Sequence, residues 1–486
     1  MSLSSAISNA LSGLTATTRG TEIVSTNVSN KTVSGYARRE VELSSRLYAA
    51  NGGGVAIDGV RRMVNAGLLA ENRLAMARAT NSGTIATFHG AMETSFGTAN
   101  DATSLSSILT AFDAAIASAT ARPDSDVRLQ DVLDSAQALT AKISAISTSI
   151  EDARTAAEKA IATDVGKLNT ALERVAELNR QITVTSAQGG DASSLMDARQ
   201  AAIDEICTIV PVVEVSRENG RIALFTKGGA TLLDGTIPAT LGFTAAGRVS
   251  ADMNVANGAL ATISLNGKPL SAAEMSVFSG GSIAANFQIR DELAPAYQAR
   301  IDGFAREVYA RFADPAVDPT LAAGQHGLFT DLQGNLDPAN EAGFANRIAV
   351  ASAFDPAKGG ALWRIRAGLN ATGPGDLGES GLLMRMAAAL SDNRPPASAA
   401  LSDIPRTMLT MSSDLASGAA TARLGSEAAA YQDQVHSQGL RGALLAEGVD
   451  TDAEMEALLA LEKAYAANAR VLQTVHDMLD EILRLT

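Results

Sequence analysis

One glycine-rich segment of the 486-residue chain has the spacing that binds dinucleotide phosphates. The segment TGPGDLG places Gly373, Gly375 and Gly378 in a G-x-G-x-x-G pattern. In nucleotide-binding folds these glycines follow a strand and open a helix, so that backbone N–H groups approach a pyrophosphate. A helix is predicted after the segment, and LWRIR (362–366) is a possible strand before it. Because Pro374 is unusual there and no β-α-β unit is predicted around the segment, we expect no dinucleotide cofactor.

Metal and nucleophile chemistry has even less support in the residue pattern. His89 and Glu93 lie four residues apart and would share one face of a helix, but a catalytic zinc ion needs three protein ligands. Cys207 lies among apolar residues of a predicted helix, which favours a buried structural thiol over a nucleophile. The chain contains no G-x-S-x-G, Walker A or H-E-x-x-H motif. We therefore predict no catalytic residue, no metal site and no enzyme activity.

The composition favours long helices and argues against binding to nucleic acid. Hydrophobic residues make up 46% of the chain but aromatic residues only 4%, which suits helices packed through small side chains. The net charge of -14, without a basic stripe, disfavours nucleic acid and anionic membranes as partners. No run of about 18 apolar residues predicts a membrane-spanning helix. The first residues lack the features of a secretory signal, so we expect export without a cleaved signal peptide.

Both ends of the sequence carry heptad patterns that predict a coiled coil. The C-terminal residues at steps of three and four are Leu458, Leu461, Tyr465, Asn468, Leu472, Val475, Leu479 and Ile482. The weaker N-terminal pattern consists of Leu3, Ile7, Ala10, Leu14, Thr17, Thr21, Val24 and Val28. Because isolated helices are marginal in water, we expect the two helices to pair and to contact neighbouring copies of the protein. An ordinary amphipathic helix packed on its own domain is the alternative for the C-terminal segment.

The interior of the sequence predicts long helices around a β-rich region. Helical patterns are expected at 129–184, 193–210, 283–313 (interrupted near Pro295), 381–392 and 403–447. Three segments are typical of hairpin turns, namely ENG (218–220), KGG (227–229) and LNGKP (265–269). The stretch 315–375 is predicted to be mostly loop, with possible strands at RIAVAS (347–352) and LWRIR. The expected fold class is therefore mainly α, with a smaller inserted β-rich domain.

The nesting of these segments predicts domains built from both halves of the chain. Residues 1–40 plus 449–486 would form a terminal coiled-coil domain that makes an inner layer. Residues 41–210 plus 280–448 would form a helical bundle. Residues 211–279 would form the β-rich outer domain inserted into that bundle.

Both termini resemble the signatures of bacterial flagellar axial proteins. The N-terminal resemblance lies in GLTATTRGTEIVSTNVSNKTVSGYARREVEL, and its matching residues are Gly13, Leu14, Asn27, Asn30, Gly35, Tyr36 and Arg38. The C-terminal resemblance is centred on Tyr465, Ala466 and Ala467. The middle of the chain is more specific, because LMDARQAAIDEI (195–206) and ARIDGFAREVYARFA (299–313) resemble the FlgK family of flagellar hook-associated proteins. The false dinucleotide segment lies where that family has a Gly-Asp-Asn run, although Leu377 replaces the asparagine here.

The resemblance implies a structural protein of the bacterial flagellum. A member of this family would connect hook to filament by ring-like self-assembly through its terminal helices. The implied partners are copies of itself, the hook protein, a second junction protein and an export chaperone at the C-terminal region. The implied location is extracellular, reached through the flagellar type III export apparatus. Another axial protein of the hook or distal rod is the alternative, and a secreted coiled-coil adhesin is a more distant one.

Overall fold

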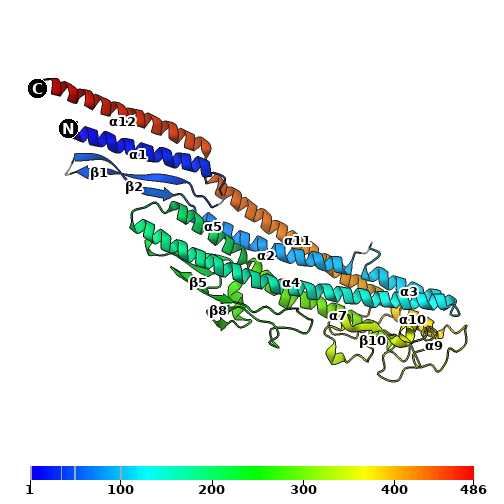
Figure 1. Cartoon of the computed structure of the whole chain (residues 1–486). Helices are drawn as coiled ribbons and strands as arrows, with labels where there is room; N and C mark the ends of the chain where they lie inside the picture. The colour runs from blue at the N-terminus through cyan, green and yellow to red at the C-terminus, as the bar shows by residue number, and fades with distance from the viewer. Residues whose placement is uncertain (1–2, 34, 49–50, 99–100, 486) are drawn as a thin grey trace.

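The computed structural model describes residues 3–33, 35–48, 51–98 and 101–485, and it has an elongated shape (Figure 1). The first and last helices lie side by side at one end, with the two chain termini close together. Long helices continue from there into a body whose small sheets lie along one side. The predicted fold class, mainly α with a smaller β-containing region, is confirmed.

Helices form most of the described chain. They are α1 (Leu3–Asn30), α2 (Ala66–Phe96), α3 (Leu105–Ala121), α4 (Asp126–Ala187), α5 (Ser193–Ile209), α6 (Gly281–Gln288), α7 (Ala294–Phe312), α8 (Phe344–Arg347), α9 (Arg364–Ala367), α10 (Gly381–Ser391), α11 (Met408–Ala446) and α12 (Thr451–Leu485). The 62 residues of α4 span about 90 Å at ~1.5 Å per residue. This helix therefore runs along most of the body.

The strands form four small antiparallel sheets. They are β1 (Arg39–Tyr48), β2 (Asn51–Arg62), β3 (Val212–Ser216), β4 (Ile222–Thr226), β5 (Thr231–Asp234), β6 (Ile237–Pro238), β7 (Leu241–Gly242), β8 (Ser264–Leu265), β9 (Lys268–Pro269), β10 (Phe329–Asp331) and β11 (Ile348–Val350). The sheet orders are β1-β2, β3-β4-β5-β6, β7-β8-β9 and β10-β11. The turns predicted at ENG, KGG and LNGKP join β3 to β4, β4 to β5 and β8 to β9, as expected.

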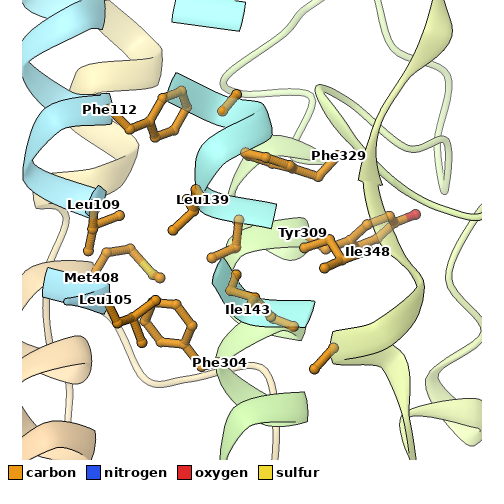
Figure 2. Close-up of a cluster of buried hydrophobic side chains, with 14 of the residues drawn as sticks. Leu105, Leu109, Phe112, Leu139, Ile143, Phe304, Tyr309, Phe329, Ile348 and Met408 are labelled. Carbon is orange, nitrogen blue, oxygen red and sulfur yellow. The ribbon is translucent and has the colours of Figure 1, made fainter. Parts of the chain in front are cut away.

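Two hydrophobic cores share α4. The first lies around its N-terminal half, where α3, α7, α11 and the β10-β11 sheet contribute large side chains such as Phe112, Phe304 and Phe329 (Figure 2). The second lies around its C-terminal half, where Ile161 and Leu172 pack against α5 and the sheets from β3 to β9. The few aromatic residues are thus concentrated in the cores of the body, and the helices elsewhere pack through smaller side chains.

The hairpin of β1 and β2 was not predicted. We expected residues from 41 onward to begin the helical bundle, but this segment forms an antiparallel ladder that packs along α1. Alternating side chains such as Val41 and Leu43, followed by three glycines at 52–54, favour a hairpin over a helix. The division into three domains remains a prediction.

One further local prediction was wrong. LWRIR is no strand, because residues 364–367 form the short helix α9. The interruption expected near Pro295 is a π-helical turn at 289–293 that separates α6 from α7, and Pro295 lies in the first turn of α7. The strand predicted at RIAVAS is confirmed as β11.

Candidate assembly interface and polar junction

The helices α1 and α12 pack antiparallel through small residues. A Cβ atom added to Gly13 would lie 2.7 Å from Asn468 Nδ2, and one added to Gly20 would lie 2.9 Å from Leu461 Cδ2. One heptad further, Asn27 Nδ2 donates to Glu454 Oε2 over 3.1 Å. The contact positions therefore recur every seven residues on both helices, in opposite directions. Glycine at these positions lets the two backbones approach closely.

Most of the predicted C-terminal heptad residues lie in this contact. Val475 is buried, and the half-buried members are Leu458, Leu461, Asn468, Leu472 and Leu479. Tyr465 and Ile482 remain 50% and 48% exposed, so they lie at the margin of the pair. The signature residues Ala466 and Ala467 are also exposed.

The N-terminal contact differs from the predicted pattern at every second step. Val24 is buried and Leu3, Ile7 and Leu14 are half-buried, but Val28 is exposed. The residues that face α12 are Gly13, Gly20 and Asn27, each one position before a predicted residue. A heptad pattern favours large apolar side chains, whereas close packing of these helices selects small or hydrogen-bonding ones. Nothing in a single chain tests contacts between copies, so the polymer contacts remain a prediction.

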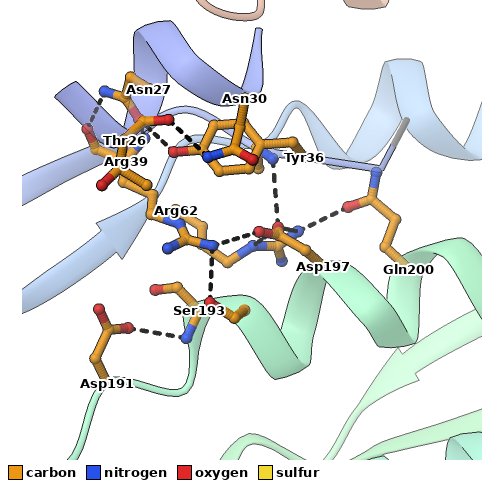
Figure 3. Close-up of polar contacts among 12 residues, drawn as sticks. Thr26, Asn27, Asn30, Tyr36, Arg39, Arg62, Asp191, Ser193, Asp197 and Gln200 are labelled. Atoms are coloured by element: carbon orange, nitrogen blue, oxygen red, sulfur yellow. Dashed lines mark hydrogen bonds and ion pairs between the residues drawn. The ribbon is translucent and has the colours of Figure 1, made fainter. Parts of the chain in front are cut away.

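Asn27 is the centre of a polar junction at the base of the helix pair (Figure 3). Its side chain is buried, and its Oδ1 accepts from the Tyr36 hydroxyl over 2.7 Å and from the Arg39 backbone N–H over 3.0 Å. Its Nδ2 donates to the Arg39 carbonyl over 2.9 Å and to Glu454. The amide thus pairs with the incoming β1 backbone much as a neighbouring strand would. Of the other predicted signature residues, Asn30 donates only within α1, to the carbonyl of Thr26.

Glu454, in the first turn of α12, holds the other side of the junction. The residue is only 1% exposed, and its Oε1 accepts from Arg38 Nε over 2.6 Å. A carboxylate at a helix N-terminus also faces the positive end of the helix dipole. The start of α12 is therefore fixed to the turn that follows α1. Sequence reasoning found Arg38 by resemblance but missed its partner, because a single Glu in an acidic helix gives no signal of burial.

Asp197 of α5 connects the junction to the body. It accepts from Arg39 Nη2 over 2.6 Å and from Arg62 Nε over 2.8 Å, and Arg62 also donates to Gln200 (Figure 3). One carboxylate thus holds both strands of the hairpin against α5. Burial raises the pKa of the Tyr36 hydroxyl, although the nearby charge of Arg39 lowers it, and the hydroxyl therefore stays a donor. Gly35 has a φ of 83° and closes the turn against α5, a conformation that favours glycine.

The glycine-rich segment is a structural loop. Helix α9 precedes it in place of a strand, so the dinucleotide arrangement is not formed. The buried Arg366 donates to the carbonyls of Pro374 and Leu377, over 2.9 and 3.3 Å. The loop carbonyls therefore accept hydrogen bonds from an arginine of the protein itself.

The other chemical candidates are also structural. His89 Nδ1 lies 3.0 Å from the Tyr297 hydroxyl, and Glu93 pairs with Arg423 at 2.5 Å. Burial raises the pKa of the Cys207 thiol to about 11, so this thiol stays protonated at neutral pH. Across the described ranges, no group of three or more His, Cys, Asp or Glu residues could hold a metal ion. None of the described helices is long and apolar enough to cross a membrane.

Comparisons with known proteins fit this architecture. Residues 90–315 match the model of the flagellar hook-associated protein FlgK helical domain, and residues 440–485 match that of the flagellar basal body rod FlgEFG protein C-terminal region. Flagellar hook-associated protein 1 of Salmonella typhimurium is 28% identical over 241 residues, which are 48% of this chain and 43% of the relative. The corresponding protein of Escherichia coli is 24% identical over 241 residues, covering 48% and 44%. The chain thus covers less than half the length of these relatives.

A solved structure has a partial likeness. The flagellar hook junction protein FlgK from Burkholderia pseudomallei aligns over 54% of this chain and 46% of that chain, with 18% identity and a TM-score of 0.44. The two family models together contain the last turns of α2, the long helix α4, the β3–β9 region, α7 and all of α12. The chain is thus similar to the FlgK helical domain of flagellar hook-associated proteins over residues 90–315 and to the C-terminal region of flagellar rod proteins over 440–485.

Proposed function

We propose that this protein is a structural junction component of the bacterial flagellum. It connects hook to filament by ring-like self-assembly through α1 and α12. The observation that carries the proposal is the exposed surface of α12, where large apolar side chains remain about half exposed after α1 has packed. These residues are Met455, Leu459, Tyr465, Val471 and Met478. Exposed apolar surface of this kind marks protein–protein contact sites.

The proposed role is mechanical and involves no catalysis. Neighbouring copies cover the exposed side of α12, and the polar junction transmits force from the helix pair to the body through Glu454 and Asp197. The further partners are the hook protein, a second junction protein and an export chaperone at the C-terminal region, with an extracellular location on the flagellum. The match to the FlgK helical domain at 90–315 favours the junction over the hook and distal-rod alternatives.

The test is to add charge to the outer side of α12 without disturbing its contact with α1. The double variant Met455→Asp and Leu459→Asp, at exposed positions one turn apart and away from the α1 contact line, should leave the monomer folded and secreted but unable to join filaments to hooks. The control is Leu377→Asp, because Leu377 is an exposed leucine in a body loop, far along the sequence from both terminal helices. Filament attachment would be counted by electron microscopy in cells lacking their own copy. Normal filaments with the double variant would rule out the proposed contact surface.

A further inference from the structure

The C-terminal half of α11 is covered on one side. Helix α2 packs along it, and Figure 1 shows α11 at the edge of the body, on the opposite side from the sheets. Ala430, Ser437 and Leu444 are half-buried and lie seven residues apart, so they mark the side of α11 towards α2. The positions two residues before each of them lie on the far side of the helix, and all three are exposed.

We call this far side the α11 face. It is centred on Ala428, Val435 and Gly442, and it also carries Leu424 and Tyr431. The exposed fractions of Leu424, Tyr431 and Val435 are 58%, 72% and 49%. Large apolar side chains that recur along one exposed side of a helix mark a protein–protein contact site.

The charged residues of this half of α11 lie off the α11 face. Glu427 pairs with Arg423 over 2.5 Å, and Arg423 pairs with Glu93 of α2 over 2.5 Å. Asp433 and Arg441 lie three or four residues from the half-buried positions, so they share the side towards α2. A helix surface in water normally carries charged residues, and charged residues make up 19% of this chain. The uncharged α11 face is therefore suited to contact with another uncharged surface.

Three glycines on the α11 face are not required by packing within one chain. Gly425, Gly439 and Gly442 lie in the interior of the helix, and a Cβ added to any of them would meet no atom within 4 Å. Glycine in a helix interior destabilises the helix relative to alanine. In the terminal pair, by contrast, Gly13 and Gly20 admit α12 at close range. The glycines of α11 therefore indicate a second helix that approaches from outside the chain.

Helix α2 presents a surface of the matching kind. Gly83 and Gly90 lie seven residues apart, and a Cβ at either would meet no atom within 4 Å. Thr87 and Thr94 are exposed on the same side, and their hydroxyls donate to the carbonyls of Gly83 and Gly90, over 2.9 Å each. The threonine hydroxyls thus form hydrogen bonds within α2. We call these four small, uncharged residues the α2 stripe.

We propose that the α11 face packs against the α2 stripe of a second copy of this chain. The inference rests on the proposed function, because it gives ring-like self-assembly a second contact in the body. Only residues 447–450 separate α11 from α12, so the α11 face continues the exposed apolar surface of α12 along the chain. Since the two surfaces differ, each copy uses one surface towards each neighbour, and such a head-to-tail contact can close into a ring.

The experiment is cross-linking between full-length chains in assembled flagella. Cells express two forms together, one with Val435→Cys and one with Thr87→Cys, and a short bismaleimide is added. Because the two cysteines are on different chains, a cross-linked dimer reports contact between copies, and the native Cys207 is buried. The dimer should form in assembled flagella and be lost when they are dissociated into monomers. Leu377→Cys with Thr87→Cys is the matched control and should give no dimer, because Leu377 is exposed in a body loop outside both surfaces.

Two glycine variants test the close approach of the helices. Gly439→Glu should abolish the dimer without lowering the melting temperature of the monomer, because the added side chain meets no atom of its own chain. Gly166→Glu, at an equally open glycine of α4, should leave the dimer unchanged.

The cross-linking result is independent of the filament counts that test the proposed function. Filaments that attach normally while Val435→Cys cross-links to no copy, or to a protein of another mass, would overturn this inference and leave the proposed function standing. A dimer that persists with Gly439→Glu would also overturn it. Normal attachment with the Met455→Asp and Leu459→Asp variant would instead count against the proposed function.

Discussion

The terminal helix pair and the body differ in the kind of side chains that they bury. The body buries phenylalanines and long aliphatic side chains on several sides of α4, and its buried charges are held by partners from the same unit. The pair of α1 and α12 has one contact line, built around Gly13, Gly20 and Asn27, and leaves large apolar residues exposed elsewhere on its surface. The body also exposes some large apolar side chains, such as Tyr431 and Leu445 of α11, but it has the large buried cores that the pair lacks.

Because of this difference, the two regions contribute differently to the free energy of unfolding. Each fully buried large aliphatic or aromatic side chain stabilises the native state by about 1.5–3 kcal/mol, and the body has dozens of them. The terminal pair has few fully buried large side chains and depends on backbone proximity and on the polar junction. Substitutions should consequently change global unfolding when made in the body, and local opening of 3–30 and 451–485 when made in the pair.

The largest effect is expected from the aromatic group of the first core. Phe312 is 1% exposed, and its ring centroid lies 5.7 Å from that of Phe112 and 5.1 Å from that of Phe329. Phe312→Ala should reduce the free energy of unfolding by about 3–5 kcal/mol, because it leaves a cavity that rigid neighbours cannot close. Chemical denaturation followed by circular dichroism measures this. Tyr465→Ala on α12 is the comparison and should change the free energy by less than about 0.5 kcal/mol. Similar losses for both would erase the distinction between the regions.

One buried carboxyl group of the body, that of Asp302, should change the free energy of unfolding by about 3 kcal/mol as the pH changes. Burial raises the pKa of Asp302 to about 6, although the N–H groups of Gly343 and Ala345 and the Gln298 amide favour its charged form. Since this pKa lies above the unfolded value of about 3.9, the folded state binds the proton more tightly. The proton on Asp302 stabilises the folded state fully below pH ~4, and this stabilisation is lost as the pH rises through ~6. The folded and unfolded pKa values differ by roughly two units.

The test of that sign is a pair of denaturation series between pH 3.5 and 7.5. Wild type should lose stability relative to Asp302→Asn as the pH rises from 4 to 6, because the amide cannot titrate. Loss of the carboxylate's hydrogen bonds shifts the variant by a constant amount and does not change the slope. Parallel curves would show that the backbone donors keep Asp302 charged throughout.

The body could be predicted from the sequence much better than the junction. Regular apolar spacing along 129–184 identified α4, because a helix buried on one face must repeat at that period. The heptads also identified the terminal helices. The local errors fell where tertiary contacts decide: the β1-β2 hairpin depends on α1 for a surface to pack on, and LWRIR became helical around the buried Ile365 and Arg366.

The candidate site was predicted only in part. The resemblance pointed to Asn27, Tyr36 and Arg38, but gave no reason for their presence. Glu454, the partner of Asn27 and Arg38, lies at the other end of the sequence, and Asp197 is 158 residues from its partner Arg39. Single charged residues carry no periodic signal that would have found either one. Gly13 and Gly20 were overlooked as contact residues for a related reason. A pattern search rewards large side chains, and close approach of two helices requires their absence.

At the polar junction, Glu454→Gln should reduce the local stability of the helix pair by about 2 kcal/mol. The variant keeps the shape of the side chain but removes the charge that pairs with Arg38, which is itself partly exposed and so loses less than a fully buried ion would. Hydrogen exchange should become faster in α1 and α12 and stay unchanged in α4. Glu456→Gln, at an exposed position two residues along α12, is the matched control. Faster exchange in α4 as well would mean that the junction also stabilises the body.

The smallest expected effect is that of replacing a glycine by leucine. This change should destabilise the helix pair but stabilise the body. Gly20→Leu should destabilise the helix pair by about 1 kcal/mol, because overpacking against Leu461 outweighs the better helix propensity of leucine. Gly166→Leu should stabilise the body by up to about 1 kcal/mol, because Gly166 is exposed on α4 and a Cβ there meets no atom within 4 Å. Hydrogen exchange of α1 reports the first and chemical denaturation the second. If Gly20→Leu slowed exchange in α1, the helices could separate enough to admit the side chain, and close approach would not be what holds the pair.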